Sequence, residues 1–99
     1  MSKYRRKAKV DNNQVQIVAD LRKMGFSIQP GHDDILVGIR GFTFWFEIKD
    51  ESCVSKRTGK ILESAKKESQ KKLEAEWKGH YSIVSSTEKI IEEIRIRLP

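Results

Sequence analysis

The chain has 99 residues, 37% of them hydrophobic and 34% charged, which suits one globular domain with a modest core and argues against disorder. Its 20 Lys and Arg against 14 Asp and Glu give a net charge of +6, an excess that favours a polyanion such as nucleic acid but does not require one. No apolar run approaches the roughly 20 residues that span a bilayer, the basic N-terminus lacks the apolar stretch of a secretion signal, and a single cysteine fits a reducing cytoplasm.

A basic segment and a helix are predicted first along the chain. Residues 1–10 carry five Lys or Arg, and we expect a flexible or frayed arm whose Arg5 and Arg6 contact nucleic acid. Asp11 followed by Gln14 resembles the capping box that starts a helix. We expect Gly25 to end this helix. The residues expected on its inward face are Gln14, Ile17, Val18, Leu21 and Met24.

Three strands are predicted next. Residues 26–29 read as a short strand, and residues 34–49 read as a hairpin. If the hairpin turns at Arg40-Gly41, its register brings Asp34 directly opposite Glu47. Opposed residues on one sheet face have Cβ atoms about 4.5–5.5 Å apart. The pattern therefore predicts two carboxylates close together on neighbouring strands.

The same hairpin face gathers an ammonium group as well. Side chains alternate along a strand, so Glu47 and Lys49 share the face to which the pairing brings Asp34. Two like charges directly opposed destabilise a sheet unless a positive group lies between them. A divalent cation would meet this need, since Mg²⁺ or Mn²⁺ favours carboxylate, carbonyl and water oxygens. Glu-x-Lys alone is more often a solvated ion pair, so this metal site is a hypothesis that depends on the register.

The second half of the chain predicts a helix, a strand and a final helix. Residues 50–60 read as a polar loop, residues 62–77 as a helix and residues 81–84 as a strand. Ser85 with Glu88 forms a second capping box that opens the last helix. A helix crossing between strands implies mixed pairing and a single-domain α/β sandwich. The stripes expected in the core are Leu62, Ala65, Ser69, Leu73 and Trp77, and then Ile90, Ile91, Ile94 and Leu98.

Three stretches of the chain resemble the PD-(D/E)XK nuclease superfamily, most closely its small stand-alone VRR-NUC members of phage and bacterial type. Residues 31–38 resemble the family's Gly-x-Pro-Asp strand, and Phe46-Glu47-Ile48-Lys49 resembles its Glu-x-Lys strand. Gln70 ahead of residues 77–81 resembles a helix glutamine followed by a glycine turn and the last strand. The likeness spans roughly residues 12–95 in consistent order. It implies one nuclease domain over residues 1–99, with an αβββαβ restriction-endonuclease-like core, a mixed sheet flanked by helices and a C-terminal helix.

The resemblance also implies roles for individual residues. Asp34, Glu47 and the main-chain carbonyl of Ile48 would hold the catalytic Mg²⁺ or Mn²⁺. Lys49 would position and deprotonate the attacking water or stabilise charge on the phosphate. Gln14 occupies the helix position where relatives often carry Glu, and its lack of charge argues against a strongly bound second metal.

Other residues are assigned to the substrate or to the core. Gln70 would contact the substrate strand or brace the site. Beside it, the lysines of the second helix are either a solvated face or a track for phosphates. Asp33 stands where the family usually has Pro and offers another carboxylate. We expect Trp45 and Trp77 to lie in the core. The lysines of the predicted second helix that form this face or phosphate track are Lys66, Lys67, Lys71 and Lys72.

Together with these residues, the resemblance implies a metal-dependent DNA endonuclease in the cytoplasm of a bacterium or a phage-infected host cell, with no membrane partner. The resemblance further suggests a homodimer that acts on branched DNA such as four-way (Holliday) junctions. A non-catalytic nucleic-acid-binding module on the same fold is the first alternative. A plain interaction protein, with its hairpin carboxylates paired to lysines, is the second. An RNA substrate also stays open.

Overall fold

The computed structural model describes the backbone of residues 2–99 and the side chains from residue 13 onward. Within this part the order of elements is helix, three strands, helix, strand, helix, which confirms the predicted order of an α/β domain. The helices are α1 (Ser2–Lys23), α2 (Glu68–Glu76) and α3 (Thr87–Arg97), with short 3₁₀ turns at Glu51–Cys53 and Glu63–Ala65. The strands are β1 (Ser27–Pro30), β2 (Asp34–Ile39), β3 (Phe42–Ile48) and β4 (His80–Val84).

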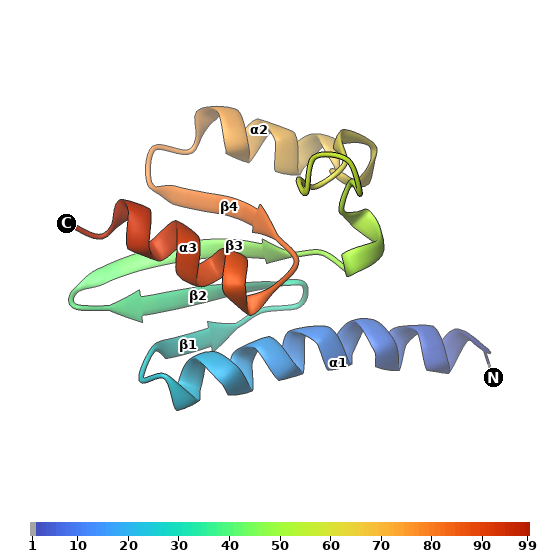
Figure 1. The fold of residues 1–99 in the computed structure, drawn as a ribbon, viewed down its shortest axis with the longest axis horizontal. Helices are drawn as coiled ribbons and strands as arrows, with labels where there is room; N and C mark the ends of the chain where they lie inside the picture. The colour runs from blue at the N-terminus through green and yellow to red at the C-terminus, as the bar shows by residue number, and fades with distance from the viewer. Residues whose placement is uncertain (1) are drawn as a thin grey trace.

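The strands form a single mixed sheet in the order β1-β2-β3-β4 (Figure 1). β1 pairs with β2 and β2 with β3 in antiparallel fashion, whereas β3 and β4 are parallel. Parallel neighbours need a long crossover connection, and α2 with the segment before it supplies this connection. The mixed pairing expected from the sequence is confirmed.

The core lies between one face of the sheet and the helices α1 and α3. Phe44 and Phe46 alternate with Trp45 along β3, so the two phenylalanines point to this buried face and Trp45 points to the other. Asp20 of α1 accepts a 3.3 Å hydrogen bond from Thr87 of α3 and ties the two helices together. Each fully buried side chain contributes about 1.5–3 kcal/mol. The buried cluster comprises Ile17, Val18, Leu21, Ile35, Val37, Phe44, Phe46, Ile48, Val84, Ile90 and Ile94.

The predicted hairpin register is confirmed. Ile39 pairs with Phe42 and Asp34 pairs with Glu47. The turn between them has positive φ at both central residues, 53° at Arg40 and 85° at Gly41, as a two-residue type I′ turn requires. Asp34 and Glu47 therefore lie at the end of the hairpin that is far from the turn.

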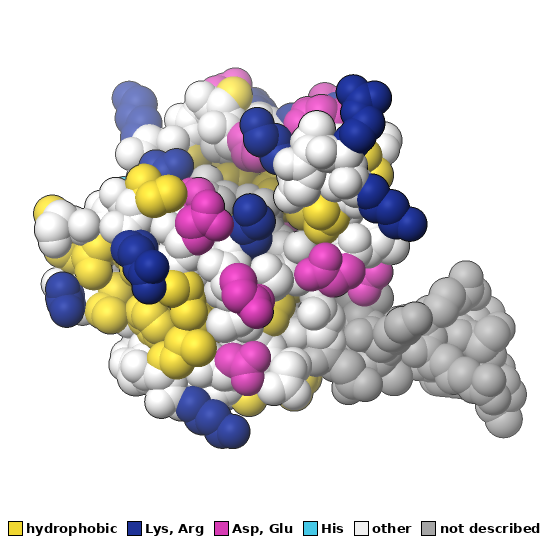
Figure 2. Space-filling view, in the orientation of Figure 1, with side chains coloured by type: hydrophobic (Ala, Val, Ile, Leu, Met, Phe, Trp, Pro, Cys, Tyr) yellow, Lys and Arg dark blue, Asp and Glu magenta, His cyan; other side chains and the backbone are white. Residues whose placement is uncertain are grey.

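A hydrophobic patch marks the turn end of the hairpin. Figure 2 shows it on the left of the molecule, over the β2–β3 turn and the C-terminal part of α3. Phe42 and Ile96 are two of the large apolar side chains that remain exposed in these elements. The patch is separated from Asp34 and Glu47 by the length of the strands.

Several sequence predictions about the helices are wrong, among them the inward position of Met24, which is 55% exposed. α1 already includes Asp11, so that residue does not start the helix. Residues 62–77 do not form one helix, because Lys66 and Lys67 adopt extended backbone angles and α2 begins only at Glu68. The break takes Leu62 out of the helical stripe, and Trp77, in the extended C-cap position, is 51% exposed rather than in the core. Ser86, not Ser85, caps α3 by accepting from the Lys89 amide.

Two further expectations concern the basic N-terminal segment and membrane-spanning helices. The flexible or frayed arm predicted at residues 1–10 is instead helical from Ser2 onward, as the first part of α1. The side chains of Arg5 and Arg6 lie outside those that the structure describes, so their contact with nucleic acid stays a prediction. Among the described residues, no helix combines the length and the apolar character needed to cross a membrane.

Candidate functional site

Asp34 and Glu47 lie opposite each other at the first position of β2 and near the end of β3. Their side chains share a sheet face with Trp45, because positions 45 and 47 have the same parity and the Trp45 ring bonds to Asp34. Lys49 follows two residues after Glu47, and its backbone amide is fixed to the Val84 carbonyl at 2.8 Å. The structure thus brings together the two carboxylates expected from the sequence, with Lys49 at the end of the same strand.

Two neighbours fix the position of the Asp34 carboxylate. The indole Nε1 of Trp45 donates a 2.8 Å hydrogen bond to Oδ2 of Asp34. The other oxygen, Oδ1, lies over Gly31, where a Cβ atom would overlap it. The Gly31 amide also donates to the Asp34 carbonyl at 2.7 Å. Asp34 is therefore held through its backbone carbonyl and through Oδ2, and the absence of a side chain at Gly31 leaves room for Oδ1.

The charge of Glu47 is set by a half-buried environment. Burial raises the pKa of Glu47 above the ordinary value, and the nearby Asp34 and Asp33 raise it further. Lys49, and to a smaller degree Lys67, act in the opposite direction. A carboxylate whose ionised form is disfavoured by burial and by a second carboxylate gains from a nearby cation.

Two amide side chains of α1 brace the backbone around the site. Nε2 of Gln14 donates to the Gly31 carbonyl at 3.0 Å, and Nδ2 of Asn13 donates to the Lys49 carbonyl at 3.3 Å. Gln14 thus holds the segment before Asp34, and its amide oxygen remains the only atom it could offer to an ion. Sequence reasoning missed Asn13. The signal was its place next to Gln14 on a helix that packs beside the strands.

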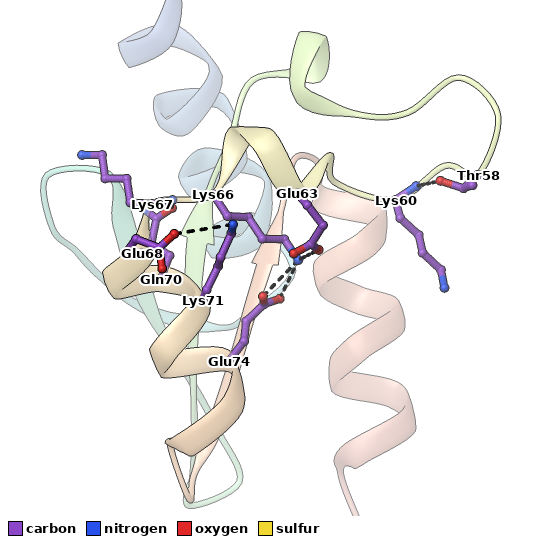
Figure 3. A network of polar contacts seen from close by, with 9 residues as sticks. All are labelled: Thr58, Lys60, Glu63, Lys66, Lys67, Glu68, Gln70, Lys71 and Glu74. Atoms are coloured by element: carbon purple, nitrogen blue, oxygen red, sulfur yellow. Dashed lines mark hydrogen bonds and ion pairs between the residues drawn. The ribbon is translucent and has the colours of Figure 1, made fainter.

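Lys66, just before α2, and Gln70 of α2 both have partners within the protein (Figure 3). Nζ of Lys66 bonds to Glu63 at 2.7 Å and to Glu74 at 3.0 Å, and the Lys66 side chain is only 11% exposed. Gln70 is 7% exposed, and its Oε1 accepts a 2.9 Å bond from the Lys67 amide at the start of α2. In this arrangement Lys66 is neutralised by acidic partners, and Gln70 caps and braces the helix.

An aromatic group lies beside the carboxylates. Trp45 packs edge-to-face against Tyr81 of β4, with ring centroids 4.9 Å apart, and against Trp77, with centroids 5.2 Å apart. The Tyr81 hydroxyl is buried and has no hydrogen-bond partner among the described residues. Burial, together with the charges of Glu47, Glu74 and Asp34, raises the pKa of Tyr81 to about 12. Sequence reasoning placed Trp45 in the core and did not find its bond to Asp34.

The oxygen donors fit a hard cation such as Mg²⁺ or Mn²⁺. Asp34 and Glu47 are opposed across two paired strands, and burial together with the neighbouring Asp34 and Asp33 raises the pKa of Glu47, so a bound cation would favour its ionised form. Among residues 13–99 no group of three or more His, Cys, Asp and Glu side chains is arranged to hold a metal ion. Mg²⁺ commonly uses one or two carboxylates and completes its shell with carbonyl, water and phosphate oxygens, so two acidic groups suffice for that mode of binding.

A pocket of about 430 Å³ lies elsewhere, along β4 between the segment before α2 and α3. It includes Tyr81 and Lys66 but neither Asp34 nor Glu47. We place the candidate site at the carboxylates and not in this pocket, because the pocket residues are largely paired with one another. Examples are Lys66 with Glu74, and Arg97 with Glu93 at 3.0 Å.

No protein-family model, no curated protein and no solved structure matches the chain. What the arrangement can do chemically therefore follows from its own groups. Two carboxylates are opposed, one of them accepts a hydrogen bond from an indole, and a lysine directly follows the strand that carries the other. Such a set can bind a divalent ion and a phosphate group together.

Proposed function

We propose that the chain is a divalent-metal-dependent endonuclease that hydrolyses DNA phosphodiesters, on a restriction-endonuclease-like αβββαβ core of the PD-(D/E)XK type and close to VRR-NUC nucleases. The observation that carries the proposal is the pairing of Asp34 with Glu47, with Lys49 two residues after Glu47 and directly past the end of β3. The parallel β3–β4 pair and the braced Gly31–Asp34 corner support it. The net charge of +6 suits a polyanionic substrate.

Each residue has a role in this proposal. Asp34, Glu47 and the carbonyl of Ile48 would hold Mg²⁺ or Mn²⁺, which supplies the charge that polarises the phosphodiester and lowers the pKa of water. The Lys49 ammonium donates to a non-bridging phosphate oxygen and stabilises the negative charge that grows there as water attacks phosphorus. Gln14 keeps the Gly31 corner in place, so that the Asp34 carboxylate stays oriented.

The substrate and the assembly belong to the same proposal. Branched DNA, such as a four-way junction, cut by a homodimer in a bacterial or phage-infected cytoplasm, is the form that the resemblance suggests. Two symmetric sites could cut paired strands at such a junction. RNA remains the variant to be tested beside DNA.

The chemistry is tested by incubating the protein with supercoiled, linear and four-way-junction DNA, and with RNA, in Mn²⁺, Mg²⁺ or EDTA. We expect cutting that requires the ion and falls at least 100-fold in Glu47→Ala and in Lys49→Ala. Glu76→Ala and Lys56→Ala, which change exposed charges outside the site, are the matched controls and should keep full activity. Cutting that persists in both site variants would show that a contaminating nuclease or another site is responsible.

A non-catalytic nucleic-acid-binding module is the second candidate, and the position of Gln14 favours it. Gln14 donates to Gly31 and brings no third negative charge to the site. Isothermal calorimetry with Mn²⁺ separates the two functions, because a binding module needs no ion. A nuclease should bind Mn²⁺ in the native chain and lose that binding in Asp34→Asn.

A further inference from the structure

The sheet face that carries the carboxylates is only partly covered by a helix. α2 packs against β4 on this face, and Leu36 of β2 remains 41% exposed there. Leu36 pairs with Trp45 across the hairpin, and Trp77 adjoins Trp45 from the end of α2. Leu36, Trp45 and Trp77 together form a surface that we call the aromatic platform.

Trp77 is exposed and yet held in place. It is 51% exposed, an unusual state for the largest apolar side chain. Its ring meets Trp45 at an interplanar angle of 81°, and Trp45 in turn is supported by Tyr81 at 74°. Its Nε1 lies so close to Gly79 that a Cβ atom there would be 2.9 Å away. These contacts fix an aromatic ring at the surface without burying it, which lowers the entropic cost of stacking another ring on it.

The platform is joined directly to the candidate metal site. The indole that supports Trp77 is the one that donates to the Asp34 carboxylate at 2.8 Å. A phosphate bound through a metal ion at Asp34 and Glu47 would therefore have its own nucleoside, or the neighbouring one, beside the platform. A base within a duplex is stacked on both faces and paired along one edge. Only an unpaired base can therefore turn outward and stack on a protein ring.

We infer that the aromatic platform stacks an unpaired nucleobase next to the phosphate at the Asp34–Glu47 pair, so that the preferred substrate contains single-stranded nucleotides. This inference rests on the proposed function for the nature of the ligand. Stacking on an aromatic ring tolerates any base, so the platform selects strand state and not sequence. A single-stranded flap, a gap or the open centre of a junction offers such a base.

Binding in EDTA tests the stacking contact by itself, without the metal ion and without any cleavage. The probes are a fluorescein-labelled 20-nucleotide single strand of mixed sequence, the same strand with abasic positions, and the corresponding duplex. We expect the native chain to bind the single strand most tightly, and Trp77→Ala to lose about tenfold in affinity for it, a typical effect for one stacked base. Trp77→Ala should bind the abasic strand as the native chain does. Trp77→Phe should retain most of the affinity, because it keeps a ring.

The chain contains two tryptophans, and both belong to the platform. In Trp45→Phe the fluorescence therefore reports on Trp77 alone, and we expect quenching by the single strand and little by the abasic strand. Ile96→Ala removes an apolar side chain that is exposed on α3 and serves as the matched control. It should leave all three affinities unchanged.

Three results would overturn the inference: equal affinity for normal and abasic strands, unchanged binding in Trp77→Ala, or a dimer that dissociates in Trp77→Ala and accounts for its lower affinity. The last result would assign the platform to a second copy of the chain, and sedimentation velocity detects it. The two proposals fail separately. Stacking in EDTA without metal-dependent cutting refutes the nuclease alone, whereas cutting that ignores strand state and survives Trp77→Ala refutes the platform alone.

Discussion

Gly31 and Asp34 share one small volume, because a Cβ atom at position 31 would overlap Oδ1 of the Asp34 carboxylate. The other oxygen of that carboxylate is held by Trp45 at 2.8 Å. A side chain at position 31 would therefore rotate Asp34 away from the indole. Gly31 does not have a positive φ, so this position requires glycine because a side chain would not fit and not because of its backbone conformation.

The first prediction concerns Gly31→Ala. We expect Mn²⁺ affinity to fall at least tenfold, or about 1.4 kcal/mol, because Asp34 must leave its present orientation. Calorimetry with Mn²⁺ measures this effect. Gly38→Ala is the control in the same strand pair, where a new Cβ would meet the Ser27 Cβ at an ordinary 3.6 Å. If both variants bind Mn²⁺ like the native chain, the orientation of Asp34 has no part in metal binding.

The second prediction concerns the stability of Glu47→Gln. Burial raises the pKa of Glu47 in the folded state above the ordinary value of 4.5, so the unfolded chain releases this proton at lower pH than the folded chain. The folded state then binds more protons between the two values, and the contribution of Glu47 to stability falls as the pH rises through that window. Without metal, Glu47→Gln should melt at a higher temperature than the native chain at pH 7–8, and the difference should shrink below pH 4.5.

Added Mn²⁺ should reverse this order at neutral pH. The ion stabilises only the chain that binds it, so the native chain should gain melting temperature and Glu47→Gln should not. Calorimetric scans at several pH values, with Mn²⁺ and with EDTA, measure both effects. A native chain that is already more stable than Glu47→Gln in EDTA at pH 8 would contradict the prediction.

The third prediction concerns the buried hydroxyl of Tyr81. It has no hydrogen-bond partner among the described residues, and an unsatisfied buried polar group costs about 1–3 kcal/mol. Tyr81→Phe keeps the ring against Trp45 and removes the hydroxyl, so we expect it to stabilise the fold by about 1 kcal/mol. Urea denaturation at pH 7 measures the change.

The titration of the same residue provides an independent check. The pKa of Tyr81 is raised to about 12 by burial and by the nearby carboxylates, against an ordinary value of 10.0. A difference in ultraviolet absorbance between the native chain and Tyr81→Phe should therefore show a phenol that ionises near pH 12. Ionisation near pH 10 in the folded chain would mean that water reaches the hydroxyl.

The hairpin could be predicted from the sequence because its turn and its alternation are local. A turn at Arg40-Gly41 pairs the residues on either side of it, and counting residues away from the turn along both strands then pairs Asp34 with Glu47. The hydrogen bond from Trp45 to Asp34 could have been predicted from the same register, since the two residues are diagonal neighbours on one sheet face.

The second helix could not be predicted in the same way, because its start depends on tertiary contacts. The spacing from Leu62 to Trp77 is helical only if the chain is continuous, and the chain turns extended at Lys66 and Lys67. There Lys66 bonds to Glu63 and Glu74, and Gln70 caps the new helix. These partners are apparent only in the folded molecule, and for that reason the exposed position of Trp77 was missed.

The fourth prediction tests the turn on which the carboxylate pairing depends. Arg40 adopts a φ of 53°, a left-handed conformation that costs a residue with a Cβ roughly 1 kcal/mol. Asn is far better suited to this position of a type I′ turn, so Arg40→Asn should stabilise the fold by about 0.5–1 kcal/mol. Gly41 has a φ of 85°, and Gly41→Ala should destabilise the fold by about 1–2 kcal/mol.

Urea denaturation measures both turn variants, and Mn²⁺ calorimetry shows whether the far end of the hairpin has moved. The hydrophobic pattern of β2 and β3 holds the register independently of the turn, because a slip by one residue would expose Val37 and Phe44. Arg40→Asn should therefore bind Mn²⁺ as the native chain does. A variant that is more stable but no longer binds Mn²⁺ would show that the register had shifted, and that the native turn, not the strand pattern, sets the distance between Asp34 and Glu47.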